Sequence, residues 1–287
     1  MKLANLALVS ATLLTLVTVG CKKDDSDDDD DVGSTEAQLV ADDKEAAETD
    51  EDLEVGLDEP LSGAVATDPG NPADGASDDE VSEKLRTNPG LFFQPAGCLV
   101  SARAGNVITH TFTGCKGPYG MTEFNGTVTT TYAREPGKLT ITHEASGLKA
   151  NGATISGKRV VVYTREGTVI SKNRTGSWSG TTAKGRPITH EASFVTTYDA
   201  SSRCLTRDGS AQTTIGGRSF ERTIDGFKRC GIGRGGCPSS GTIVLSRTRQ
   251  GTTMSVTIEF LGGPSYRVTG PKGGQVTLPL VCLPTAG

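Results

Sequence analysis

Polar and apolar residues alternate in short runs through the last two thirds of the chain, from about residue 88 to residue 287. In the run 254–260, Met, Val, Ile and Phe occupy every second position. In the run 138–145, Leu139, Ile141 and His143 alternate with polar residues. Successive side chains of a strand point to opposite faces, so this period of two predicts half-buried β-strands.

Turn signals containing glycine separate these runs, and glycine supplies the positive φ that hairpin turns need. They are Ala104-Gly105-Asn106, Glu135-Pro136-Gly137, Asn151-Gly152, Glu166-Gly167, Lys184-Gly185, Gly216-Gly217, Gln250-Gly251 and Gly262-Gly263. We expect eleven to thirteen strands in an all-β antiparallel meander, with no helix after the first 20 residues. A sandwich, a strongly curved sheet and a barrel all fit, although outer faces rich in Thr, Arg and Lys favour a soluble sheet.

The chain begins with Met1-Lys2, an apolar run over residues 3–19, and Gly20 directly before Cys21. This order resembles the signal and lipobox of bacterial lipoproteins, although Thr18 stands where that pattern has an aliphatic residue. The resemblance implies a signal peptide over residues 1–20, acylation of Cys21, and a lipid anchor in the cell envelope. Because Lys22 rather than Asp follows the cysteine, it also implies the outer membrane. An ordinary secretory signal or an uncleaved anchor is the alternative.

Charge divides the remainder of the chain into two opposed regions. Residues 22–84 contain 24 Asp and Glu against four Lys, whereas residues 86–287 contain 24 Lys and Arg against ten Asp and Glu. The acidic region has little apolar surface to offset the entropy lost on ordering. We therefore predict a lipidated, disordered acidic linker over residues 21–87 and a basic β domain over residues 88–287. A calcium loop in the Asp27–Asp31 run is disfavoured, because the run has no EF-hand glycine or distal glutamate.

Six cysteines follow Cys21, and an even number in an exported chain predicts three disulfides among fifteen formal pairings. Cys98 and Cys115 lie almost symmetrically about the Gly105-Asn106 turn, as partners at the base of a hairpin would. Cys230 and Cys237 bracket a glycine-rich loop, which leaves Cys204 and Cys282 as the third pair. No CxxC or clustered Cys and His spacing indicates zinc.

All three histidines occur in the tripeptide Ile-Thr-His, at His110, His143 and His190. Alternation places each histidine on the face of its isoleucine and directs Glu144 and Glu191 to the opposite face. If the strands were neighbours, the three imidazoles could form a metal site or a proton-handling cluster. The alternative, which we favour, is a repeated strand module with histidines bonded to backbone or threonine. No cofactor is predicted.

Several apparent motifs lack their defining features. The GIGRGG segment at 231–236 lies between cysteines and lacks the strand and helix of a dinucleotide site. Trp178 occupies the nucleophile position of the GSWSG segment, and neither His-Glu pair has the second histidine of HExxH. No catalytic residue is predicted.

Residues 98–282 also resemble a broad group of uncharacterised Gram-negative lipoproteins and secreted proteins. The resemblance rests on the segment 112–118 (FTGCKGP), the segment 125–129 (NGTVT) and the glycine-rich loop before Cys237-Pro238. It implies a disulfide-bonded β domain and no activity.

The sequence therefore predicts a non-enzymatic, lipid-anchored envelope or surface protein that displays a rigid basic β domain. Expected partners are the membrane, through the lipid, and an anionic polysaccharide or lipopolysaccharide, with nucleic acid only as a nonspecific polyanion. In a second interpretation, the acidic segment is itself the counter-ion of the domain. A hydrolase or metal-dependent enzyme with a histidine site and a carrier of lipid or lipopolysaccharide are the alternatives.

Overall fold

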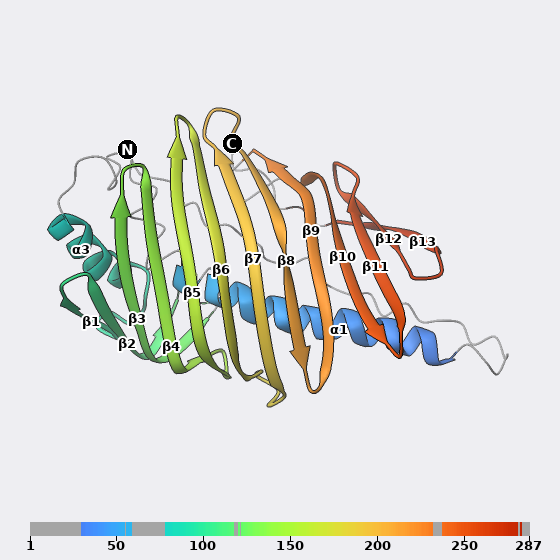
Figure 1. The fold of residues 1–287 in the computed structure, drawn as a ribbon, viewed down its shortest axis with the longest axis horizontal. Helices are drawn as coiled ribbons and strands as arrows, with labels where there is room; N and C mark the ends of the chain where they lie inside the picture. The colour runs from blue at the N-terminus through green and yellow to red at the C-terminus, as the bar shows by residue number, and fades with distance from the viewer. Residues whose placement is uncertain are drawn as a thin grey trace.

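The computed structural model describes residues 30–54, 56–58, 78–117, 120, 122–231, 237–280 and 282. Thirteen antiparallel strands form one twisted sheet in which each strand pairs with its neighbour in sequence, with β1 and β13 at the two edges (Figure 1). The strands are β1 Leu99–Ala104, β2 Val107–Lys116, β3 Glu123–Glu135, β4 Lys138–Ala150, β5 Ala153–Glu166, β6 Val169–Thr181, β7 Pro187–Asp199, β8 Cys204–Ile215, β9 Arg218–Cys230, β10 Pro238–Arg249, β11 Thr252–Phe260, β12 Ser265–Thr269 and β13 Gln275–Pro279.

The predicted all-β meander is confirmed, as a single sheet rather than a sandwich. Each of the eight glycine turn signals lies between two successive strands. At the β4–β5 turn, Asn151 and Gly152 have φ of 47° and 85°, the pair of positive values that a tight two-residue hairpin requires. Turn chemistry and strand period therefore specify the same topology.

The two faces of the sheet differ in burial, as the alternation predicts. Along β7, exposed and buried residues alternate strictly from Pro187 to Thr196. His190 and its isoleucine lie on the buried face, and Glu191 lies on the exposed one. The same division holds for His143 and Glu144 on β4.

Among the described residues, helical segments precede the sheet at α1 Asp30–Leu53, α3 Asp78–Thr87 and the 3₁₀ helix η2 Asn88–Leu91. The prediction of no helix after the first 20 residues is therefore wrong, and these described parts of the acidic segment are helical rather than disordered. Buried positions in α1 recur every three or four residues, for example Leu39, Asp43, Ala46 and Asp50. This is the period of a helix with one face against the protein, although half of that face is acidic.

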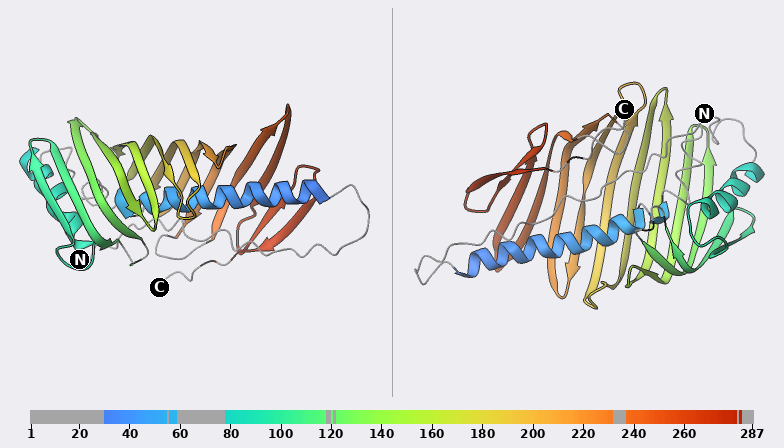
Figure 2. Two further views of the ribbon diagram at one scale, coloured as in Figure 1. Left: turned by 90° about the horizontal axis from the view of Figure 1, so that it is seen from below. Right: turned by 180° about the vertical axis from the view of Figure 1, so that it is seen from behind.

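α1 lies across the buried face of the sheet, and α3 lies against β1 and β2 (Figures 1 and 2). The main apolar cluster runs under α1 from β2 to β10, and it joins Leu39 and Ala46 of α1 to Ile215 and Leu245 of the sheet. At its β2–β3 end, Phe93, Phe112 and Phe124 pack edge to face or tilted, with ring centroids 5.1–6.1 Å apart. Val81 and Leu85 of α3 are fully buried in a neighbouring cluster. Apolar contacts and ion pairs therefore both hold α1 against the sheet.

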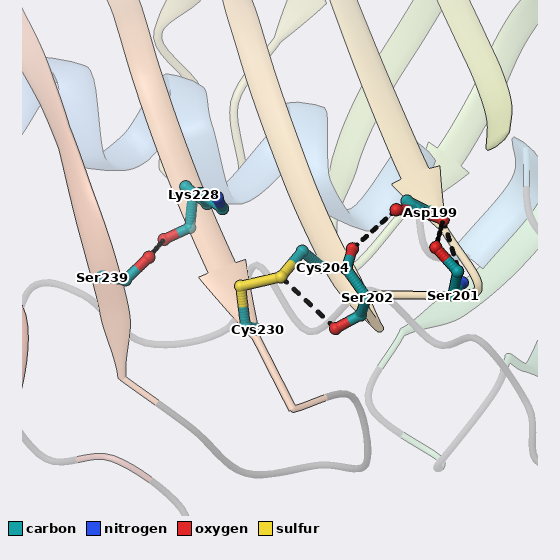
Figure 3. Close-up of a disulfide and its surroundings, with 7 residues drawn as sticks. All are labelled: Asp199, Ser201, Ser202, Cys204, Lys228, Cys230 and Ser239. Atoms are coloured by element: carbon teal, nitrogen blue, oxygen red, sulfur yellow. Dashed lines mark hydrogen bonds between the residues drawn. A yellow bond between two sulfur atoms is a disulfide. The ribbon is translucent and has the colours of Figure 1, made fainter.

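All six cysteines after Cys21 form disulfides, and the predicted Cys98–Cys115 bond is confirmed. The other two predicted pairings are wrong, because the bonds are Cys204–Cys230 and Cys237–Cys282. Cys204 and Cys230 are opposite each other in the β8–β9 register, which brings them within bonding distance (Figure 3). Sequence proximity across a glycine loop had suggested a different partner for Cys230, but strand register decides the pairing.

Candidate binding face: a basic sheet surface covered by an acidic helix

The candidate site is the sheet surface beneath α1, where basic side chains from β5 to β9 meet acidic side chains of one helix. A π-helical turn at residues 54 and 56–58 continues α1, and we call α1 with this turn the acidic helix. The acidic side chains in ion pairs with this surface are Asp42, Asp43, Glu45, Asp50, Glu54 and Asp58. The basic partners, which we call the basic face, are Arg159, Lys172, Arg174, Lys184, Arg186, Arg207, Arg218 and Arg222.

Asp50 is the centre of this interface. Arg174 donates from Nη1 to Asp50 Oδ1 at 3.0 Å and from Nη2 to Oδ2 at 2.7 Å, which is a bidentate pair. Arg159 donates from Nη2 to Oδ1, and His190 Nε2 lies 3.6 Å from the same oxygen. The Arg159 and Arg174 side chains are 8% and 3% exposed, so these contacts are shielded from solvent.

Glu54 forms a second centre one helical turn further along. Lys172 Nζ donates to Glu54 Oε1 at 3.1 Å, and Arg207 Nη2 donates to Oε2 at 3.0 Å. Phe194 lies beneath two of the guanidinium groups, with the Cζ atoms of Arg174 and Arg207 at 5.1 and 4.6 Å from its ring centroid. These cation–π contacts fix the two arginines on the sheet itself.

The other end of α1 is held by side chains near the β6–β7 and β8–β9 turns. Asp42 accepts from Arg218 Nε at 2.7 Å and from Arg186 Nη1 at 2.7 Å. Glu45 accepts from Arg186 Nη2 and, at 3.3 Å, from Lys184 Nζ. The two arginine side chains are 27% and 32% exposed, so solvent screens this end more than the centre.

Proximity to guanidinium groups governs the charge state of the central carboxylates. Burial alone would raise the pKa of Asp50, but the Coulombic attraction of Arg174 and Arg159 holds its pKa well below the ordinary value. Arg207 and Lys172 likewise overcome burial and keep the pKa of Glu54 well below its ordinary value. Both side chains are therefore ionised throughout the pH range of living cells.

Glu51, between these two, has the opposite behaviour. Burial, and then repulsion from Glu54 and Asp52, raises its pKa to about 7. The basic face thus compensates particular carboxylates of the acidic helix rather than its charge as a whole.

The three histidines are buried, and each bonds through Nδ1 to a hydroxyl on the adjacent strand: Ser101 for His110, Thr130 for His143 and Thr213 for His190. Burial lowers their pKa values to about 3, 4 and 4 respectively. They belong to β2, β4 and β7, and at ~4.8 Å per strand His190 lies about 14 Å from His143 across the sheet. The three histidines thus have the geometry of the repeated strand module. Within the described chain, no three His, Cys, Asp or Glu side chains are placed as metal ligands.

Sequence reasoning missed the helical form of the acidic segment and the position of the basic face, whereas the ion pairs agree with the second interpretation, in which that segment is the counter-ion of the domain. The sequence analysis expected Arg and Lys on the outer faces of the sheet, but Arg159, Arg174 and Arg207 lie on the face that α1 covers. The missed signal is the recurrence of acidic and apolar residues every three or four positions between Leu39 and Asp58, within an Ala- and Glu-rich stretch. Cys21 lies outside the described residues.

Comparison of the chain with protein families, curated proteins and solved structures finds no match. Among the described helices, none has the length and apolar character needed to cross a membrane.

Proposed function

We propose that the protein is a lipid-anchored envelope module that binds an anionic polysaccharide through its basic face. The signal-like residues 1–20 and Cys21 support the anchor, and the six later cysteines support an oxidising compartment. In this proposal the acidic helix is an internal competitor that covers the basic face until a polyanion replaces it.

One observation carries the binding proposal: eight Lys and Arg side chains from adjacent strands and turns converge on one surface, and each contacts a carboxylate. Buried ion pairs contribute little net stability, because desolvation cancels most of the Coulombic gain. A sheet that needed only a covering helix would be equally stable with apolar residues at these positions. The charges instead provide a surface complementary to acidic groups, which favours an anionic partner over the apolar ligand of a lipid carrier.

The test uses the full mature chain and polygalacturonate, a carboxylate polymer, at two salt concentrations. The variant Asp42→Asn/Asp50→Asn/Glu54→Gln weakens the hold of the acidic helix on the basic face, and we expect at least tenfold tighter binding than wild type. Higher salt should weaken the binding, because neutralised charges release counter-ions.

The matched control is Glu48→Gln/Asp79→Asn/Glu135→Gln, which removes the same charge from solvent-exposed side chains. We expect this control to bind like wild type. If both triple variants bind equally, or neither binds at low salt, the basic face is not a polyanion site.

The anchor has its own test. Metabolic labelling with palmitate should mark the wild-type protein, and the label should disappear in Cys21→Ser. A wild-type protein that stays unlabelled in the soluble fraction would contradict envelope anchoring.

A further inference from the structure

The surroundings of Asp50 have the features of a binding site that belongs to the sheet rather than to the helix. Arg159, Gly176 and Ala192 are in register across β5, β6 and β7. The latter two are small, so they form a depression bounded by larger side chains. A Cβ on Gly176 would lie 2.7 Å from the Lys158 carbonyl oxygen and 3.1 Å from Arg159 Cγ. Glycine at this position therefore lets Arg159 lie flat across the sheet.

Two of the groups around the depression, Arg174 and His190, are also held by sheet residues. Arg174 lies over Phe194, as described above. His190 is bonded to Thr213 and stacked on Trp178, with ring centroids 4.9 Å apart. A site whose groups are fixed before the ligand arrives loses little entropy on binding.

Several buried polar atoms around the depression have unused hydrogen-bonding capacity. Among the described residues, Arg174 Nε, Trp178 Nε1 and His190 Nε2 are buried without a hydrogen-bond partner. Arg174 and Trp178 are 3% and 4% exposed, and both line the remaining gap beside Asp50. A buried polar atom without a partner is costly, and a ligand that supplies the partner removes that cost.

We infer that Arg159, Arg174, His190 and Trp178 form a carboxylate-binding site, and that Asp50 occupies it as an internal ligand. The bidentate contact with Arg174 selects a planar group with two oxygens, as a uronate or a free carboxylic acid supplies. This inference deepens the proposed function by naming the position at which one carboxylate of the polymer is recognised. Asp50 fills the depression, so a ligand group enters only when Asp50 leaves.

The test is chemical rescue of Asp50→Ala in the full mature chain, with the thermal midpoint measured against acetate concentration. Sodium chloride is adjusted to keep the ionic strength constant. The substitution removes only the carboxylate of Asp50, and acetate supplies a carboxylate with one additional methyl group. We expect a saturable rise of the midpoint with acetate, because a ligand that binds only the folded state stabilises it by mass action. Calorimetric titration of acetate should give one site per chain.

Two further variants make the result specific. Asp79→Ala removes an exposed carboxylate that contacts Arg103, and its midpoint should not depend on acetate. Asp50→Ala/Arg174→Met should lose the saturable response. If Asp50→Ala folds only when acetate is present during refolding, that also supports the site.

An equal response to chloride, or refolding that acetate does not improve, would overturn the inference. Inorganic phosphate is included as a third anion, and phosphate binding at least as tight as acetate binding would overturn the preference for carboxylates. The outcome is independent of the polymer assay, since rescue without polygalacturonate binding refutes the proposed function alone.

Discussion

Acidification from pH 7 to pH 5 should destabilise this protein, and the three buried histidines should be the cause. Their pKa values in the fold are about 3, 4 and 4, against an ordinary value of 6.5. Between these pKa values, the histidines are protonated in the unfolded chain and neutral in the folded chain. Stability must therefore fall as the pH falls.

The size of the effect follows from these values. Each histidine should cost about 2 kcal/mol of unfolding free energy between pH 7 and pH 5, or about 6 kcal/mol for the three. Glu51 acts in the opposite direction, because its pKa of about 7 in the fold exceeds its ordinary value of 4.5. Protonation of Glu51 should add about 2 kcal/mol to the unfolding free energy over the same pH range. The net expectation is a loss of about 3 to 4 kcal/mol.

The assay is urea unfolding of the disulfide-intact chain at pH 7, 6 and 5, with His143→Gln as the diagnostic variant. The substitution removes one titrating group, so the loss between pH 7 and pH 5 should shrink by about 2 kcal/mol whatever the stability at pH 7. Glu144→Gln alters the neighbouring exposed residue and should keep the wild-type dependence. Wild-type stability that is constant or rises towards pH 5 would refute the reasoning, as would an unchanged slope in His143→Gln.

Three further predictions concern stability. Arg174→Met should destabilise the fold by about 3–5 kcal/mol in urea unfolding, because it leaves buried carboxylates uncompensated. The control Arg103→Met removes an exposed ion pair and should cost about 1 kcal/mol or less. Equal losses in the two variants would contradict the burial argument. Phe124→Ala should cost about 3–5 kcal/mol, since it empties the centre of the aromatic cluster, and a loss below about 1 kcal/mol would contradict this packing. Removal of the Cys204–Cys230 bond by a double serine substitution should cost about 3–4 kcal/mol for a separation of 26 residues. Mass mapping of the wild-type protein should recover a peptide pair joined by that bond, and a Cys230–Cys237 peptide would contradict the fold.

The sheet could be predicted from the sequence because each local signal is sufficient by itself. A Gly or Asn with positive φ marks most of the hairpin turns, although Arg203 has this conformation at the β7–β8 turn, and the period of two fixes which face each side chain occupies. The disulfide pairings could not all be predicted from such local signals. Cys98–Cys115 spans one hairpin and follows from symmetry about its turn, whereas Cys237–Cys282 joins a loop to the chain end and depends on how β10 to β13 are arranged.

The acidic helix could not be predicted by treating each region separately. Alone, the segment around Asp42 and Asp50 has too much repulsion and too little apolar surface to fold. The sheet supplies the missing attraction, because Arg174 and its neighbours occupy inward positions where alternation would place apolar residues. The acidic helix thus carries carboxylates, and the sheet carries arginines, at buried positions where apolar residues are expected. The opposite charges compensate each other at these positions.

This mutual compensation determines how the helix can be released. Asp50 and Glu54 have pKa values well below their ordinary values, so mild acid leaves their ion pairs intact while it protonates Glu51. Protonation of Glu51 removes a repulsion beside Glu54 and strengthens the hold of the helix. Mild acid therefore does not release Asp50 or Glu54 unless it unfolds the sheet through its histidines, whereas burial raises the pKa of Asp43, so its contact with Arg222 is lost first. In the proposed function, a competing anion would open the basic face, because it would replace the carboxylates one by one and leave no arginine uncompensated.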